Sequence, residues 1–511
     1  MANLTPMMQQ YLDVKEQYSD CILFFRLGDF YEMFFSDAET ASRELEITLT
    51  GRDCGLAERA PMCGVPFHSA DTYITRLINK GFKVAICEQV EDPNEAKGIV
   101  RREVIKVVTP GTVTESSMLD DKKNNYLMSI YRFNTYHFGI ASVDISTGEF
   151  FSTSINWGNT IGKLMDEIAR FLPAEIVVNR ETYEDENLTK EIKQRFNTYI
   201  THFDEECFGS GFSEDRINSH FEEKKDFEFE GNIDINASGA LLEYLYRTQK
   251  AGLPHIRTIN RYRIEDYMVL DVTARRNLEI SETMRDKSKK GTLLWVLDRT
   301  MTSMGARTLR RWVDQPLINK SDIDFRLDAV EELKSRFMMR MELRELLKKV
   351  YDMERLLSRV ILQNANGRDL TALKVSIGQI PNIKGILSDA KSGHLFNNFN
   401  ELDTLDDVYE LIEASIIDEP PVSVKDGGII KTGYNEDVDR LRNASVEGKT
   451  WIAQIEAQEK EKTGIRNLKV GFNKVFGYFI EVTKSNINNV PDYYIRKQTL
   501  ANCERYITDE L

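Results

Sequence analysis

Hydrophobic and polar positions along residues 1–113 alternate in a way that predicts short strands interspersed with helices. The apolar run CILFFRL (21–27) is bounded by polar residues and predicts a buried strand. Residues 30–47 have helical spacing, and Asp29 with Glu32 three positions later resembles a capping box that would begin this helix. After a segment rich in glycine, cysteine and proline, DTYITRLINKG predicts another helix and FKVAICEQV another strand. This alternation is typical of a small mixed α/β domain.

The polar segment ESSMLDDKKNN (115–125) predicts a boundary, and a second α/β pattern follows it. Three β-rich runs, YLMSIYRF, YHFGIASVDI and GEFFSTSI, are separated by turn residues and predict a meander. A helix (IGKLMDEIARF) and a further strand (AEIVVN) follow before the polar stretch 210–230. We therefore expect a second α/β domain.

From about Asp234 the pattern changes to long helical segments with heptad-like apolar spacing, which predict an extended helical domain. Examples are TLLWVLDRTMTSMGARTLRRWV and DFRLDAVEELKSRFMMRMELRELLKKV. The pattern breaks near Pro420 and Pro421. A long polar helix over 435–464 is then expected to lead into two strands, RNLKVGFN and GYFIEVT, with residues 473–476 as the hairpin turn.

The length and composition exclude several classes of protein. A chain of 511 residues corresponds to roughly three to five domains at about 100–200 residues each. The mean hydropathy of −0.41 and the lack of a long apolar run argue against a membrane span, and the first residues do not resemble a secretory signal. Six scattered cysteines argue for a reducing compartment without a disulfide framework. We expect a cytoplasmic protein with no membrane partner.

The net charge of −15 speaks against a surface coated in nucleic acid, yet three segments oppose it. Residues 97–106 carry four basic and one acidic residue, 285–311 carry eight and two, and 466–497 carry six and two. Such runs are usually solvated faces. The last segment is the best candidate for a phosphate-binding ribbon, because its basic residues flank a hairpin that carries aromatic residues. These aromatic residues are Phe472, Phe476 and Tyr478.

No motif supports an enzyme active site. The chain lacks the phosphate-binding loop of nucleotide-hydrolysing enzymes, the nucleophile elbow of hydrolases and the paired histidines of zinc proteases. Asp144 and Glu149 could be nuclease carboxylates that hold magnesium, but we favour turn residues of a hairpin. A group in the first domain fits no zinc template, and we interpret its thiols as buried structural groups. This group comprises Cys54, Cys63, His68 and Cys87.

A series of long motifs follows along the whole chain in order. They are RLGDFYEMF (26–34), APMCGVPFHS (60–69), GFKVAICEQVEDP (81–93), VTPGTV (108–113), ASVDISTGEF (141–150), RRNLEI (275–280), MTSMGARTLRRWVDQPL (301–317), DGGIIKTGYNEDVD (426–439), LKVGFNKVFGYFIEVTKSN (468–486) and RKQTLANCERYITDEL (496–511). Together they strongly resemble the bacterial MutS family of DNA mismatch recognition proteins.

The resemblance implies a multidomain fold of α/β and α parts. Residues 1–113 correspond to a small mixed α/β mismatch-recognition domain, and 125–250 to an α/β, RNase H-like connector. Residues 255–430 correspond to the long-helix core and levers, and 431–511 to a β-containing clamp that closes around DNA. The family continues into an ATPase domain, which binds ATP and magnesium and supplies most of the dimer contact. This chain has no Walker motif, so we expect a truncated chain without a cofactor or catalytic activity of its own.

The resemblance also implies site residues. Phe30 and Glu32 match the family's Phe-x-Glu element, which reads the lesion; an aromatic wedge in the minor groove stacks on a base and kinks the duplex. The alternative is core packing for Phe30 and helix capping for Glu32. Arg52 and Arg102 match DNA backbone-contacting arginines, or are ordinary surface charges. The clamp's candidates for phosphate contact are Lys469, Lys474, Lys484, Arg496 and Lys497.

Two classes of function remain at this point. The first is a lesion sensor that binds and kinks double-stranded DNA at mispairs and small loops. Its full-length parent would be a homodimer that uses ATP to signal to a MutL-type repair protein. The second is an interaction scaffold derived from the same family, without lesion recognition. The complete Phe30-Tyr31-Glu32 motif favours the sensor, and a nuclease is a distant third hypothesis.

Overall fold

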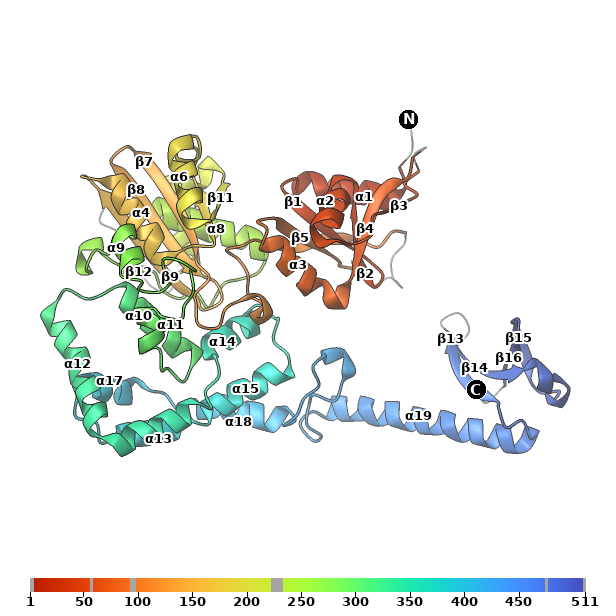
Figure 1. Cartoon of the computed structure of the whole chain (residues 1–511). Coiled ribbons are helices and arrows are strands. Elements are labelled where there is room, and N and C mark those ends of the chain that lie inside the picture. Colours follow the sequence, from red (N-terminus) through yellow and green to blue (C-terminus); the bar gives the residue numbers. More distant parts are fainter. Residues whose placement is uncertain (1–3, 56–57, 92–97, 222–232, 474–476, 509–511) are drawn as a thin grey trace. The chain divides into compact units, whose positions relative to one another are not determined.

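The computed structural model describes residues 4–55, 58–91, 98–221, 233–473 and 477–508. The chain forms two compact units, Met1–Tyr409 and Glu410–Leu511. Both units mix helices with β-sheet, and the described residues form three sheets, as Figure 1 shows. No helix within these described ranges has the length and apolar character needed to cross a membrane.

The first sheet has the strand order β3-β4-β2-β1-β5-β6, and only β1 and β5 pair in parallel. Helices α2 and α3 pack on one face of this sheet, and α1 packs on the other (Figure 1). Its elements are α1 (Pro6–Gln17), β1 (Cys21–Leu27), β2 (Phe30–Phe34), α2 (Phe35–Leu45), β3 (Thr50–Arg52), β4 (Ala60–Pro66), a 3-10 turn (Phe67–Ser69), α3 (Ala70–Ile78), β5 (Lys83–Gln89) and β6 (Arg102–Val108). The small mixed α/β fold predicted here, with buried strand 21–27, is confirmed.

The helix expected over residues 30–47 is wrong in its first part. Residues Phe30–Phe34 form strand β2, which pairs with β1 across a tight turn where Gly28 has a φ of +58°, and α2 starts only after this strand. Aromatic residues favour strands, and of the two strands that pair with β2 one, β4, is distant in sequence. The capping box of Asp29 and Glu32 is therefore wrong, because Glu32 lies within the strand.

The second sheet has the order β11-β10-β7-β8-β9-β12. The predicted meander is confirmed as antiparallel strands β7, β8 and β9, and β10 and β11 add in parallel beside β7. Helices α4 and α6 cover one face, and α7 and the buried α8 cover the other (Figure 1). The elements are β7 (Leu127–Asn134), β8 (His137–Asp144), β9 (Glu149–Asn156), α4 (Thr160–Phe171), β10 (Glu175–Val178), α5 (Arg180–Tyr183), α6 (Glu186–Phe196), β11 (Tyr199–His202), α7 (Ser210–His220), α8 (Ile233–Gln249) and β12 (Asn260–Arg261).

The third region is helical, as predicted, but its helices are shorter than the sequence pattern suggests. The segment containing α10 and α11 is interrupted where Thr302 caps α11 by accepting a hydrogen bond from the backbone of Gly305. A second interruption at Arg336 separates α12 from α13. The helices are α9 (Val272–Asn277), α10 (Leu293–Leu297), α11 (Ser303–Asp314), α12 (Lys320–Ser335), α13 (Phe337–Leu347), α14 (Met353–Ile361), α15 (Gly367–Ile377), α16 (Ile380–Leu387), α17 (Gly393–Glu401) and α18 (Asp406–Ser415).

The second unit contains the predicted long helix and a four-stranded sheet. Helix α19 (Glu436–Thr463) begins where the Asn435 side chain accepts a hydrogen bond from the backbone of Val438, and it ends at Gly464, whose φ is +71°. The predicted strands are confirmed as β13 (Lys469–Asn473) and β14 (Gly477–Thr483), but most of their turn lies outside the described residues. Two unpredicted strands, β15 (Ile495–Thr499) and β16 (Cys503–Ile507), complete the order β13-β14-β16-β15.

Candidate nucleic-acid interface

Phe30 is an exposed aromatic residue at the start of strand β2. Its side chain is 46% exposed, whereas the nearby Phe24, Phe25 and Phe34 are fully buried. Phe30 lies opposite Pro66 of β4 in the strand register. The structure therefore places Phe30 outside the core, where a flat ring is free to stack on a partner.

Glu32 lies two positions along the same strand, so it shares a face of the sheet with Phe30. Its carboxylate forms an ion pair with Arg52 of β3. The Glu32 side chain is mostly buried and that of Arg52 is 38% exposed. Opposite Glu32 is Gly64, and a Cβ added there would lie 3.4 Å from the Glu32 Cγ. This small neighbour leaves room for the carboxylate, and Arg52 fixes its position.

The turn that presents Phe30 is braced by Arg26. The Arg26 Nε donates a hydrogen bond to the Gly28 carbonyl at 2.6 Å, and its guanidinium lies 3.8 Å from the centroid of the Phe67 ring. Arg26 also lies 3.4 Å from Glu88, which accepts a hydrogen bond from the buried Tyr31 hydroxyl. Burial, with the Glu88 contact, raises the pKa of Tyr31. Sequence reasoning missed this brace, because two of its partners, Phe67 and Glu88, are far from Arg26 along the chain.

Arg102 is only 8% exposed. Its guanidinium donates hydrogen bonds to the carbonyls of Arg26 and Val100 at 2.7 and 2.8 Å and to the Gln10 side chain at 3.0 Å. Burial lowers its pKa. These contacts make Arg102 a structural link among β6, β1 and α1. Its contact with a DNA phosphate stays a prediction, and its burial speaks against that prediction.

The second unit presents exposed cations around its sheet. Lys469, Lys484 and Lys497 are exposed and form no ion pair within the described part of the chain. The Arg496 side chain is also exposed, although it lies 3.5 Å from Glu504. Lys474 lies outside the described residues. The structure therefore leaves three lysines available for a polyanion.

Two exposed aromatic rings lie on the β13–β14 hairpin, which also carries Lys469. Phe472 and Tyr478 are paired across β13 and β14, and their ring centroids are 5.1 Å apart. Phe476, the third aromatic residue noted in this hairpin, lies outside the described residues. A hairpin with an exposed lysine and exposed aromatic rings can contact a nucleic-acid backbone through its charge and its rings.

Asp144 and Glu149 are engaged in structural contacts. The buried Asp144 carboxylate accepts hydrogen bonds from the backbone of Ser146 at 2.9 Å and of Asn125 at 3.2 Å, and the Asp144 carbonyl accepts one from Gly148 at 2.8 Å. Glu149 forms an ion pair with Arg311. No cluster of three or more potential metal ligands occurs among the described residues. These contacts favour the turn interpretation over a nuclease site.

Comparisons with known proteins agree along the chain. The family model of MutS domain I matches residues 5–117, and that of MutS domain II matches residues 125–257. The model of MutS domain III matches residues 273–504. The DNA mismatch repair protein MutS of Acetivibrio thermocellus is 67% identical over 514 residues, covering all of this chain and 59% of the relative. That of Ruminiclostridium cellulolyticum is 66% identical over 511 residues, covering all of this chain and 58% of the relative. The chain thus spans less than two thirds of these relatives' length.

Proposed function

We propose that this chain, which belongs to the MutS family, binds double-stranded DNA at mispairs and small insertion or deletion loops and kinks it there. The observation that supports this most directly is the exposed Phe30 on a braced strand, beside a carboxylate that Arg52 holds in place. An aromatic side chain inserted between base pairs from the minor groove partly unstacks them and bends the duplex.

Lesion selectivity follows from the cost of unstacking. A mispaired or unpaired base has already lost pairing energy, so Phe30 can displace and stack on it at a lower cost than on a paired base. Base–aromatic stacking contributes roughly 1–3 kcal/mol. On matched DNA this gain is offset by the pairing that must be broken. Phe30 therefore stabilises the complex mainly where a lesion is present.

Glu32 acts against matched DNA. A carboxylate near phosphates is repulsive unless it gains a hydrogen bond, for example by taking up a proton and donating it to a purine ring nitrogen. In the free protein the ion pair with Arg52 balances this charge. A displaced base offers Glu32 a hydrogen-bonding partner that a matched duplex does not. Glu32 therefore lowers the affinity for matched duplex DNA.

The second unit would supply affinity that does not depend on sequence. Phosphate contacts from lysine and arginine release counterions and make binding depend steeply on salt. Lys469, Lys484 and Lys497 are proposed as such contacts, because they are exposed and form no ion pair with the described residues. Arg496 and Lys474 complete the proposed set, and in the first domain Arg52 can add a phosphate contact through its exposed part.

We assign the domains accordingly. Residues 1–113 would be the mismatch-recognition domain, 125–250 the connector, 255–430 the helical core and levers, and 431–511 the clamp. The three antiparallel strands followed by parallel β10 and β11 support an RNase H-like connector. The β13–β16 sheet at the end of α19 supports a clamp.

For the full-length parent we propose a homodimer that binds ATP and magnesium and signals to a MutL-type repair protein. Family membership supports these partners. We also propose a cytoplasmic location. The six free cysteines, five of them buried, fit a reducing compartment.

The test is the binding of the chain to a matched duplex and to one with a single unpaired thymine, measured by fluorescence anisotropy at several salt concentrations. A lesion sensor binds the bulged duplex more tightly at every salt concentration. An interaction scaffold without lesion recognition binds neither duplex or binds both equally, and either result would refute the proposal.

A further inference from the structure

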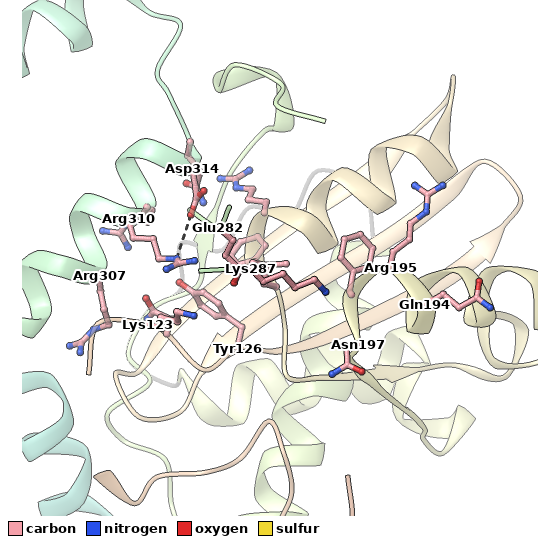
Figure 2. A pocket seen from close by; sticks show the side chains of 17 residues that line it. Lys123, Tyr126, Gln194, Arg195, Asn197, Glu282, Lys287, Arg307, Arg310 and Asp314 are labelled. Atoms are coloured by element: carbon pink, nitrogen blue, oxygen red, sulfur yellow. Dashed lines mark ion pairs between the residues drawn. The ribbon is translucent and has the colours of Figure 1, made fainter. Parts of the chain in front are cut away.

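A basic cavity of about 340 Å³ lies in the first unit, between the second sheet's helices and α11. Figure 2 shows Arg307, Arg310 and Lys123 at one end of it, Gln194, Arg195 and Asn197 at the other, and Lys287 reaching in between. Its lining contains seven basic side chains but only two acidic ones, Glu282 and Asp314. Four of the seven pair with carboxylates outside the lining, Arg170 with Glu167, Arg195 with Glu191, Arg307 with Asp352 and Glu354, and Arg311 with Glu149. The positive charge left for a ligand is therefore that of Lys123, Lys287 and Arg310.

Several of these cations are not fully neutralised. Lys123 and Lys287 form no ion pair with any residue that the structure describes. Arg310 lies 3.7 Å from Asp314, which is already bound by Arg275 at 2.9 Å. Burial raises the pKa of Asp314. Its single carboxylate therefore balances two guanidinium groups incompletely.

Two further guanidinium groups have unused donors at the cavity wall. The Nε atoms of Arg170 and Arg307 are buried and have no hydrogen-bond partner within the described residues. The Arg170 side chain is 6% exposed and lies 4.3 and 4.6 Å from the ring centroids of Tyr262 and Tyr267. A buried charged donor without a partner costs free energy. The other nitrogens of these groups pair with carboxylates, Arg170 with Glu167 and Arg307 with Asp352 and Glu354, so the two arginines shape the cavity wall and are not its main anion contacts.

We propose that this cavity binds a small phosphate-bearing anion of the size of pyrophosphate or a nucleoside diphosphate, with Arg310, Lys287 and Lys123 as its main contacts. Arginine matches phosphate oxygens with paired donors, and lysine adds a point charge. The cavity volume is at the lower end of the range for small-molecule sites, which excludes a large ligand.

Binding would strengthen the attachment of the second sheet's domain to the helical region. Lys123 precedes β7, Lys287 lies between α9 and α10, and Arg310 is on α11, so one anion would contact three segments. The two regions already meet through the Arg311–Glu149 ion pair and the hydrogen bond from Arg307 to the Asp121 carbonyl at 3.0 Å. The ligand would add a third contact to this junction, through Lys123, Lys287 and Arg310.

The test is isothermal titration of the whole chain with pyrophosphate and, separately, with ADP, at one ionic strength and without magnesium. A double variant, Lys287→Gln with Arg310→Gln, should weaken pyrophosphate binding by about tenfold or more. The matched control, Arg285→Gln with Lys290→Gln, removes two cations from the same basic segment but outside the cavity lining, and should change binding less than about twofold. Lys287→Gln alone, at an exposed position, tests the site if the double variant unfolds.

Binding of both probes, weakened by the same variant, supports a nucleotide as the source of the phosphate. Binding of pyrophosphate alone supports a free phosphate compound. The proposal fails if pyrophosphate does not bind, or if both double variants weaken it equally, which would show a diffuse charge effect.

Discussion

Glu32 and Arg52 form the ion pair on which discrimination against matched DNA depends in this account. We expect Glu32→Ala to bind matched duplex about two- to tenfold more tightly, because it removes roughly 1 kcal/mol of repulsion from a polyanion. We compare the ratio of the affinity for bulged duplex to the affinity for matched duplex. This ratio should be the same in the double variant Glu32→Ala with Arg52→Gln as in Glu32→Ala alone, because without the Glu32 carboxylate Arg52 has nothing to position.

A double-mutant cycle of the two affinities at one salt concentration measures this coupling. If Arg52→Gln changes the ratio equally in the presence and absence of Glu32, Arg52 does not act through Glu32. If Glu32→Ala binds matched duplex no more tightly, the penalty assigned to Glu32 is wrong.

The proposal that Phe30 and Glu32 read the lesion could be made from the sequence, but the surroundings of the two side chains could not be predicted from it. Phe30 and Glu32 belong to a motif that is contiguous in the chain. Arg52, the ion-pair partner of Glu32, is 20 residues away, and its place beside Glu32 depends on the intervening β4 strand. The burial of Arg102 could not be predicted from the sequence either, because it depends on three hydrogen-bond acceptors from separate segments.

At the scale of elements, the sheet of the second unit should act as an electrostatic contact with DNA. Replacing Lys469, Lys484 and Lys497 together by Gln should weaken binding to matched and bulged duplexes alike. The slope of log affinity against log salt should fall by about 0.9 for each phosphate that the variant no longer neutralises. The measurement is a salt titration of both duplexes.

A control variant carries Arg440→Gln and Lys460→Gln, which remove cations that are ion-paired to Asp437 and Glu456 on α19. For each charge removed, this control should change the slope of log affinity against log salt less than the triple lysine variant does. An unchanged slope in the triple lysine variant would mean that these lysines are merely solvated.

Glu332 joins α12 to the start of α17. It accepts hydrogen bonds from the backbone N–H groups of Ser392 at 2.7 Å and Lys391 at 3.0 Å and pairs with Arg336. Burial by itself raises the pKa of Glu332, but these contacts outweigh it and lower the pKa to about 2. Because the folded-state pKa is depressed, the stabilisation is complete above the ordinary pKa of about 4.3 and is lost as the pH falls toward 2.

We therefore expect Glu332→Gln to lower the free energy of unfolding by about 1–3 kcal/mol at pH 7 and by clearly less at pH 3. Denaturant unfolding at both pH values measures the difference. Glu331→Gln, at the exposed neighbouring position, should have little effect at either pH. A Glu332→Gln effect that does not change with pH would contradict the assigned role of the carboxylate.

Most elements could be predicted from the sequence where their stabilising contacts are local. Strand 21–27 was predicted because its apolar run is bounded by polar residues, and helix 435–464 because a long polar segment lies between Asn435 and Gly464, which cap its two ends. The helical segments at 292–350 were predicted as too long, because apolar periodicity continues across breaks such as Thr302, where a side-chain cap starts a new helix. Strands β15 and β16 were missed because their alternation is weak and pairing across the sheet defines them.

At the scale of the molecule, Arg355 attaches the segment between the first two domains to the helical region of the same unit. It is 5% exposed and donates hydrogen bonds to the carbonyls of Asp120 at 3.0 Å and Lys123 at 2.7 Å, and to the Ser146 hydroxyl at 3.2 Å. Arg355→Ala should lower the free energy of unfolding by about 3–5 kcal/mol, as expected when one partner of a buried charged network is removed.

We expect this loss to expose residues 115–125, so that limited proteolysis cuts there first. Arg359→Ala is the matched control, because Arg359 lies on the same helix but binds Asp369 within the helical region at 2.7 Å. It should destabilise the protein without exposing this segment. Equal protection of the segment in Arg355→Ala and the wild-type chain would contradict the attachment.

The most direct test of the central claim is the effect of Phe30→Ala on affinity for a duplex with one unpaired thymine and for its matched counterpart, at one fixed salt concentration. The loss of base–aromatic stacking should weaken the binding free energy for the bulged duplex by roughly 1–3 kcal/mol. The affinity for the matched duplex should be nearly unchanged. Ile105→Ala, at an equally exposed apolar position on β6, should affect neither. Equal weakening of both duplexes by Phe30→Ala would contradict the claim that this side chain reads the lesion.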